Sequence, residues 1–268
     1  MQATINGISL AYHDQGQGLP IVFLHAFPLN RRMWAQQEAA LSIQSRIITI
    51  DLRGHGESDA PLWHYTLDQA ADDVRALLDN LSIQQAVLVG LSMGGYILFA
   101  FYRKYAERVK GLILADTRPQ ADTPEGKEGR FQMAQIAYQK GPGAIADLMI
   151  PKLLSPATIQ TRPEIVQTVR AMIESNQISG IAGDLMAMAE RPDSVPLLKQ
   201  IACPTQIIVG ELDRATPPSD AKLMAEQIPA SRLATIPEAA HLSNLEQPES
   251  FNQIVGSFVG ELTKRTTI

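Results

Sequence analysis

Residues 86–102 contain no charged side chain, and this stretch constrains the fold more than any other part of the chain. It is shorter than the roughly 20 apolar residues that a membrane-spanning helix needs, and glycines and a serine interrupt its middle. A buried parallel strand over 86–89 that feeds a buried helix explains the pattern better, because central strands of an α/β sheet are covered on both faces. We therefore expect this stretch to lie at the centre of such a sheet.

Short apolar runs alternate with helix-like segments along most of the chain. Further strands are expected at 21–24, 47–50, 111–115, 206–209 and 233–236. Helices are expected over 67–81, after Ser92, after Pro217 and over 248–262. The dipeptide Asn6-Gly7 between two apolar segments predicts a hairpin that adds antiparallel strands at one edge. This order predicts an α/β fold with a mostly parallel central sheet and helices on both faces.

The segment 118–199 breaks this alternation. It has no clear strand pattern, and amphipathic helical stretches are punctuated by prolines and glycines. It also carries five of the chain's methionines, which pack readily in irregular apolar surroundings and would suit a surface that faces a substrate. The sequence thus predicts an α/β core formed by 1–117 and 200–268, with 118–199 as a helical lid (cap) insertion over the carboxyl edge of the sheet.

The composition indicates which kinds of binding partner and which cellular location are expected. The net charge is −5 and no block of basic residues is present, which argues against nucleic acid and anionic membranes as partners. The single cysteine, Cys203, excludes an intramolecular disulfide framework. The first residues lack the basic and apolar regions of a secretory signal, so a cytoplasmic location is expected. The sequence leaves open whether the protein is a monomer or a homo-oligomer.

The turn after the central strand carries a candidate nucleophile. Its sequence is Gly90-Leu91-Ser92-Met93-Gly94, in which the glycines permit a turn so tight that side chains would collide there. A turn of this kind between strand and helix holds the serine hydroxyl clear of the sheet. A buried turn serine is the alternative interpretation, and the flanking strand and helix make it the weaker one.

An acid and a base follow later strands. Asp213 comes after the strand at 206–209, and His241 comes after the strand at 233–236. In open parallel sheets such residues collect at the carboxyl ends of the strands, and the order Ser92, Asp213, His241 is the order expected of Ser-His-Asp hydrolases of this topology. Asp116 also follows a strand and remains a competitor for the role of the acid, although the chain order favours Asp213.

Each of these residue types has a chemical task. A serine hydroxyl becomes a good nucleophile when a neighbouring imidazole accepts its proton, and a carboxylate beyond the ring fixes the tautomer and stabilises the imidazolium. Backbone N–H donors are needed for the developing oxyanion. We expect one from Met93, which follows the nucleophile, and the other from Phe27 in the loop after the strand at 21–24.

With these motifs the chain resembles the α/β-hydrolase superfamily over nearly its whole length, and in pattern it is most similar to small esterases related to 3-oxoadipate enol-lactonases and cofactor-free haloperoxidases. The matching motifs are His25-Ala-Phe-Pro28, Asp51-Leu-Arg-Gly-His-Gly-Glu-Ser58, the turn around Ser92, Gly210-Glu-Leu-Asp213 with Thr216-Pro-Pro218, and Ala240-His241. Ala26 stands where the family usually has glycine. The resemblance implies a lid over the active site and no metal or organic cofactor.

The sequence therefore predicts a serine carboxylesterase that cleaves small or medium acyl esters. The first alternative is an enol-lactonase-type lactone hydrolase, whose anionic product would favour cations in the lid, for which Lys127, Arg130, Lys140 and Arg170 are available. The second alternative is a receptor or signalling relative that keeps an intact triad but binds a ligand through the lid. Repeated ester hydrolysis by each protein molecule would distinguish an enzyme from a receptor.

Overall fold

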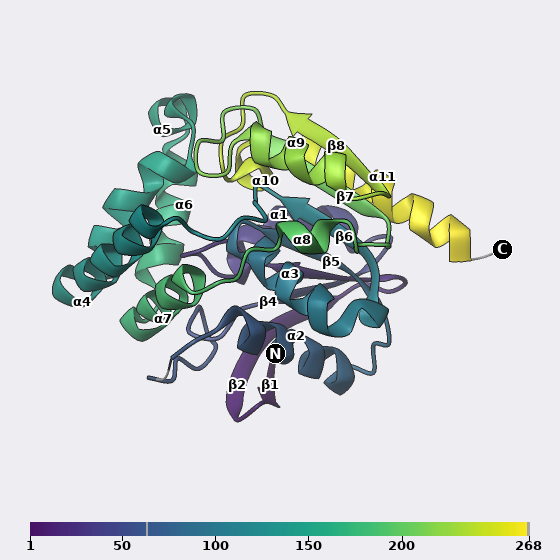
Figure 1. Ribbon diagram of the computed structural model, residues 1–268, viewed down its shortest axis with the longest axis horizontal. Coiled ribbons are helices and arrows are strands. Elements are labelled where there is room, and N and C mark those ends of the chain that lie inside the picture. Colours follow the sequence, from purple (N-terminus) through teal and green to yellow (C-terminus); the bar gives the residue numbers. More distant parts are fainter. Residues whose placement is uncertain (63, 267–268) are drawn as a thin grey trace.

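An eight-stranded sheet forms the centre of the protein in the computed structural model, which describes residues 1–62 and 64–266 (Figure 1). The strands are β1 (Gln2–Ile5), β2 (Ile8–Gln15), β3 (Pro20–Leu24), β4 (Arg46–Ile50), β5 (Ala86–Leu91), β6 (Val109–Ala115), β7 (Thr205–Gly210) and β8 (Ser231–Ile236). Their order is β1-β2-β4-β3-β5-β6-β7-β8. The pairs β1/β2 and β2/β4 are antiparallel and the remaining pairs are parallel. The expected strands and the edge hairpin are therefore all present.

Helices cover both faces of the sheet. Those of the sheet region are α1 (Ala35–Leu41), α2 (Leu67–Asn80), α3 (Met93–Tyr105), α9 (Pro218–Gln227), α10 (Ser243–Glu246) and α11 (Pro248–Thr266), with short 3-10 turns η1 (Arg31–Trp34) and η2 (Ala106–Arg108). Helices α1 and α11 pack together on one face, while α2 and α3 pack together on the other. The fold class is thus the α/β class that the alternating pattern predicts.

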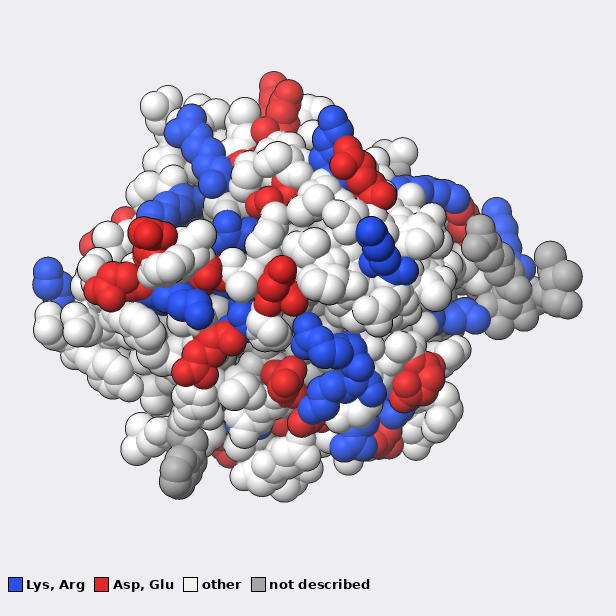
Figure 2. All heavy atoms as spheres, viewed as in Figure 1, with Lys and Arg blue, Asp and Glu red and all other residues white. Residues whose placement is uncertain are grey.

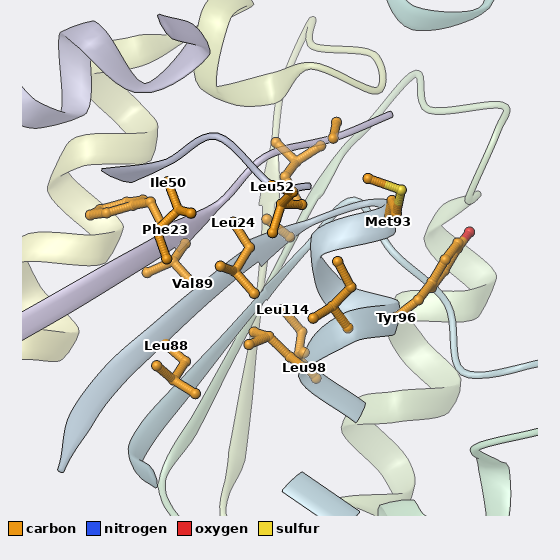
Figure 3. Packing of buried hydrophobic residues seen from close by; sticks show 14 of the residues in the cluster. Phe23, Leu24, Ile50, Leu52, Leu88, Val89, Met93, Tyr96, Leu98 and Leu114 are labelled. Carbon is orange, nitrogen blue, oxygen red and sulfur yellow. The ribbon is translucent and has the colours of Figure 1, made fainter. Parts of the chain in front are cut away.

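The uncharged stretch forms the middle of the core. All six residues of β5 are buried, because β3 and β6 flank the strand and helices cover its two faces. In Figure 3, Val89 of β5 lies beside Phe23 of the paired strand β3, and Leu98 of α3 lies beside Leu114 of β6. Close packing of this kind makes the interior stiff, so the turn at the end of β5 rests on a rigid base.

The segment 118–199, which the structure describes throughout, is helical and contains no strand. Its helices are α4 (Pro124–Leu153), α5 (Pro156–Thr161), α6 (Pro163–Glu174), α7 (Ile178–Ala189) and α8 (Val195–Leu198). Helix α4 is kinked at Gly141, whose φ of 77° lies outside the helical region.

The helical segment lies over loops at the carboxyl ends of the strands. The Asn176 side chain donates to the Pro28 carbonyl at 2.7 Å, and its oxygen accepts from the Gly56 N–H at 2.8 Å. The Leu242 N–H donates to the Leu153 carbonyl at 3.1 Å. Residues 28, 56 and 242 follow β3, β4 and β8, so one end of the sheet is covered by helices α4 to α7 (Figure 1).

Two glycines bring helix α7 into backbone contact with the sheet region. A Cβ atom placed on Gly180 would lie 1.8 Å from the carbonyl oxygen of Gly54. Gly54 itself has a φ of 84°, a conformation that side-chain-bearing residues rarely adopt. Helix α7 can therefore pack this closely on the loop after β4 only because residue 180 is a glycine.

Gly180→Ala is expected to lower the free energy of unfolding by about 1–3 kcal/mol, because the added methyl meets backbone that has no room to move. Urea denaturation measures this change. The matched control is Gly129→Ala in α4, where a Cβ atom would meet nothing within 4 Å. Alanine there is expected to raise stability by about 0.5–1 kcal/mol. Equal effects of the two substitutions would contradict the close contact.

The surface mixes charges of both signs. On the face drawn in Figure 2, acidic and basic side chains lie among each other. Several of the protein's charged side chains form ion pairs, such as Arg46 with Asp14 at 2.7 Å and Arg108 with Asp79 at 2.8 Å. Within residues 1–62 and 64–266, no helix combines the length and the apolar character needed to cross a membrane.

Candidate active site

Ser92 occupies a strained turn between β5 and α3. Its φ of 56° and ψ of −112° are unusual for a residue with a side chain. The turn closes because Gly90 and Gly94 lack side chains: a Cβ on Gly90 would lie 2.5 Å from the Gly94 backbone, and one on Gly94 would lie 2.3 Å from the Leu24 carbonyl. The expected strand, sharp turn and helix are thus all present around Ser92.

The structure brings Ser92, His241 and Asp213 into one hydrogen-bonded series. The Ser92 Oγ lies 2.8 Å from His241 Nε2, and His241 Nδ1 lies 2.8 Å from Asp213 Oδ2. All three residues are buried, with exposed fractions of 9%, 3% and 3% in the order Ser92, Asp213 and His241. They follow β5, β7 and β8, whose carboxyl ends meet at the covered end of the sheet.

The surroundings of Asp213 keep it ionised. Its carboxylate accepts hydrogen bonds from the Ala215 and Thr216 N–H groups at 2.8 and 3.0 Å and from the Thr216 hydroxyl at 2.7 Å. Burial alone would raise the pKa of this carboxyl, but the charge of His241 and these hydrogen bonds lower it below its usual value. Asp213 therefore presents a fixed negative charge to the imidazole.

The same pair sets the pKa of His241. Burial would lower this pKa, but the charge of Asp213 and its hydrogen bond outweigh burial and raise the pKa above 6.5. With the Nδ1 proton donated to Asp213, Nε2 is free to accept a proton from the Ser92 hydroxyl. Chemically, the arrangement can generate a nucleophilic serine oxygen and store its proton on the imidazole.

Asp116, the competing acid, is held by other groups. It follows β6 and is completely buried, and its carboxyl accepts from the Gly210 N–H at 2.7 Å and from the Ser243 hydroxyl. In the part of the chain that the structure describes, Asp213 is the carboxylate bonded to His241. The geometry therefore favours Asp213 for the acid position.

The two candidate oxyanion donors come from neighbouring elements. Met93 is the first residue of α3, and N–H groups in the first turn of a helix have no partner within that helix. Phe27 lies in the loop that follows β3. Gly94 packs against the Leu24 carbonyl, so this loop begins beside the first turn of α3. Their role as oxyanion donors remains a prediction.

The rings of His25 and His55 form hydrogen bonds with backbone groups of the loops: His25 Nδ1 lies 3.0 Å from the Ala26 carbonyl and His55 Nδ1 lies 3.3 Å from the Arg53 carbonyl. The backbone N–H of Leu52 donates to His25 Nε2 at 3.1 Å, which ties the loops after β3 and β4 together. Burial lowers the pKa of His25 to about 4. Burial and the charge of His25 lower the pKa of His55 to about 3. Both rings are therefore neutral near pH 7.

Three polar residues that hold these loops were given no role from the sequence, although Thr216 stands in one of the matching motifs. Thr216 bonds Asp213, Ser243 bonds Asp116, and Glu246 accepts from the N–H groups of Ala240 and Ser155 at 2.6 and 2.8 Å. The spacing from Asp213 to Thr216 fits a side-chain-bonded turn and could have indicated the first. Ser243 bonds a partner 127 positions away, and Glu246 joins Ala240, six positions away, to Ser155, 91 positions away. For the two distant partners the chain carries no local signal. Among the described residues, no group of three or more acidic, histidine or cysteine side chains is placed to bind a metal ion.

These features define a class of protein, and sequence comparison supports it. The profile of the alpha/beta hydrolase fold family matches residues 20–248, so the chain belongs to this family. The resemblance and the fold class expected from the motifs are confirmed.

Individual relatives place the chain among esterases and lactonases of that family. A solved esterase from Thermogutta terrifontis is 42% identical, with a TM-score of 0.95 over 98% of each chain. The enol-lactonase from Burkholderia xenovorans is 31% identical, with a TM-score of 0.91 over 97% of this chain and 100% of its own. The 3-oxoadipate enol-lactonase 2 of Acinetobacter baylyi is 34% identical over 94% of this chain and 93% of its own.

Proposed function

We propose that the protein is a serine hydrolase that cleaves carboxylic esters through an acyl-enzyme on Ser92. The observation that carries this proposal is the hydrogen-bonded series Ser92, His241 and Asp213, assembled from three strand ends. An esterase at 42% identity over nearly the whole chain supports the same chemistry.

The first half of the reaction forms the acyl-enzyme. The Ser92 oxygen attacks the ester carbonyl carbon while His241 Nε2 takes the hydroxyl proton, and Asp213 stabilises the resulting imidazolium. The N–H groups of Met93 and Phe27 bind the oxyanion of the tetrahedral intermediate, a contribution worth about 10²–10³ in rate for each donor. When the intermediate collapses, the carbon–oxygen bond to the alcohol breaks and the imidazolium returns its proton to the departing alcohol.

The second half releases the acid. A water molecule takes the place of the alcohol, and neutral His241 accepts one of its protons as its oxygen attacks the acyl carbonyl. Collapse of this second intermediate breaks the bond to Ser92, and the proton on His241 returns to the serine oxygen. The cycle consumes one water and needs no redox partner.

We assign the segment 118–199 the role of a lid that shapes the acyl site. Its contacts with Pro28 and Leu242 support this, since Pro28 follows the candidate oxyanion residue Phe27 and Leu242 follows His241. The hydrolase core then consists of 1–117 and 200–268.

Hydrolysis of a lactone is the second candidate, because relatives over 30% identical are named enol-lactonases. The lid cations that would favour an anionic product are partly engaged. Arg130 bonds Asp122, and Arg170 lies 2.6 Å from Asp147 and 3.2 Å from Glu174. Because these arginines are already paired with carboxylates, we favour an ordinary ester over a carboxylated lactone as the substrate.

Steady-state turnover of p-nitrophenyl esters with acyl chains of increasing length tests the proposal. We expect many turnovers per enzyme, with the highest kcat/KM for short or medium chains. A single slow turnover that leaves a stable product complex would instead identify a ligand receptor. A lactone hydrolysed with a much higher kcat/KM than every ester would favour the second candidate.

A further inference from the structure

Asp116 is a buried carboxyl group with contacts to both loops of the candidate triad. Its Oδ1 accepts from the Gly210 N–H at 2.7 Å, and its Oδ2 shares a hydrogen bond with the Ser243 hydroxyl. Gly210 stands three residues before Asp213, and Ser243 stands two residues after His241. One side chain at the end of β6 thus contacts both the last residue of β7, which leads into the loop of Asp213, and the first residue of α10, which follows the loop of His241.

The backbone at Asp116 is shaped for this contact. Its φ of 42° is unusual for a residue with a side chain, and such strain persists where the surroundings hold it in place. The Asp116 N–H donates to the Ile208 carbonyl at 2.9 Å, which fixes the residue against β7. A second link between the same two loops, from the Leu212 N–H to the Ala239 carbonyl, lies nearer the surface, where Leu212 is 45% exposed.

We propose that Asp116 is a positioning residue, a proposal that rests on the proposed function. It joins the Asp213 loop to the His241 loop from the buried side, and so it holds the Asp213 carboxylate and the His241 imidazole at the distance that their hydrogen bond needs. Without this link, small displacements of either loop would lengthen the Asp213–His241 or His241–Ser92 contact. A misplacement of about 1 Å is enough to cost about 10²-fold in rate.

The surroundings of Asp116 favour the protonated, uncharged form of its carboxyl group at neutral pH. Burial raises its pKa to about 8, and the charge of Asp213 adds to this effect. His241 and the hydrogen bonds from Ser243 and Gly210 oppose the rise. The groups that face Asp116 are thus Asp213 from the loop after β7 and His241 from the loop after β8, with Gly210 and Ser243 as uncharged partners. A neutral carboxyl keeps both contacts without placing a second negative charge beside Asp213.

Asparagine has the shape and charge of a protonated aspartate but cannot ionise. The asparagine variant therefore distinguishes a positioning role of Asp116 from a role as the acid of the triad. We expect Asp116→Asn to keep kcat/KM close to wild type, with Oδ1 facing Gly210 and Nδ2 facing Ser243. Asp116→Ala is expected to lower kcat by about 10²-fold with little change in KM. Ser243→Ala, which breaks one of the two contacts, should fall between them. Equal, severe losses in the asparagine and alanine variants would show that the negative charge matters, and a fully active alanine variant would remove the proposed role.

The pH dependence of stability gives a second test that does not depend on catalysis. In the unfolded chain Asp116 ionises near 3.8, whereas in the folded protein it keeps its proton up to about 8. Between these values the unfolded state binds fewer protons, so wild-type stability falls as pH rises, relative to Asp116→Asn.

We therefore expect the Tm of Asp116→Asn minus that of the wild type to grow from pH 5 to about 8 and to stay constant above it. Asp193→Asn controls for the removal of an exposed carboxyl. A Tm difference independent of pH would show that the Asp116 carboxyl group is not protonated in the folded protein. This result would hold even if the protein proved not to be an esterase. Failure of the proposed function would appear separately, as ester turnover that survives Ser92→Ala.

Discussion

Replacing Ser92 with alanine is expected to lower kcat for p-nitrophenyl esters by about 10⁴- to 10⁶-fold while the protein stays folded. The substitution removes the oxygen that forms the acyl bond and leaves His241 and Asp213 in place. Alanine is no larger than serine and meets the same backbone at the φ of 56°, so the turn itself is retained. Steady-state rates and circular dichroism measure the two parts of this expectation.

A covalent probe makes the Ser92 test independent of the substrate. A fluorophosphonate should add one mass increment to the wild-type protein and none to Ser92→Ala. Ser45→Ala is a suitable control, because Ser45 is also buried yet lies before β4, at the opposite ends of the parallel strands from Ser92. Wild-type rates in Ser92→Ala, or labelling that persists in it, would show that another group is the nucleophile.

The arrangement of Ser92, Asp213 and His241 was predictable because each residue follows its own strand. Parallel strands end at the same edge of a sheet, so residues far apart in sequence that follow such strands lie near one another. The order Ser92, Asp213, His241 along the chain also favoured Asp213 over Asp116 as the candidate acid. The hydrogen-bond distances came from the structure, since strand ends alone do not fix side-chain directions.

Contacts that depend on two distant loops were not predictable in the same way. Asp116 and Ser243 are 127 positions apart, and neither belongs to a periodic pattern that marks the other. The contact of Gly180 with Gly54 likewise depends on how α7 settles on the loop after β4. The pairing of the arginines in segment 118–199 could not be predicted either: Arg130 could have faced a substrate, yet it bonds Asp122. Such contacts follow from the tertiary packing, which local pattern does not encode.

Asp213→Asn is expected to lower kcat by about 10⁴-fold, because the amide no longer stabilises the imidazolium and favours the wrong tautomer of His241. The Asp213 carboxylate, through its charge and its hydrogen bond, makes the largest contribution that raises the pKa of His241. Its loss should therefore also move the acid limb of the kcat/KM profile to lower pH. Residual activity is measured over a range of pH with the best p-nitrophenyl ester.

The comparison with Asp116→Asn decides which carboxyl group is the acid. Both substitutions replace a buried aspartate near His241 by its amide, so general effects of burial and size are matched. Under the proposed function, Asp213 needs its negative charge because it stabilises the imidazolium that forms when His241 takes the Ser92 proton, whereas Asp116 is proposed to act through shape and hydrogen bonds. We expect a loss at position 213 that is orders of magnitude larger than at position 116. The reverse ranking would move the acid of the triad from the end of β7 to the end of β6.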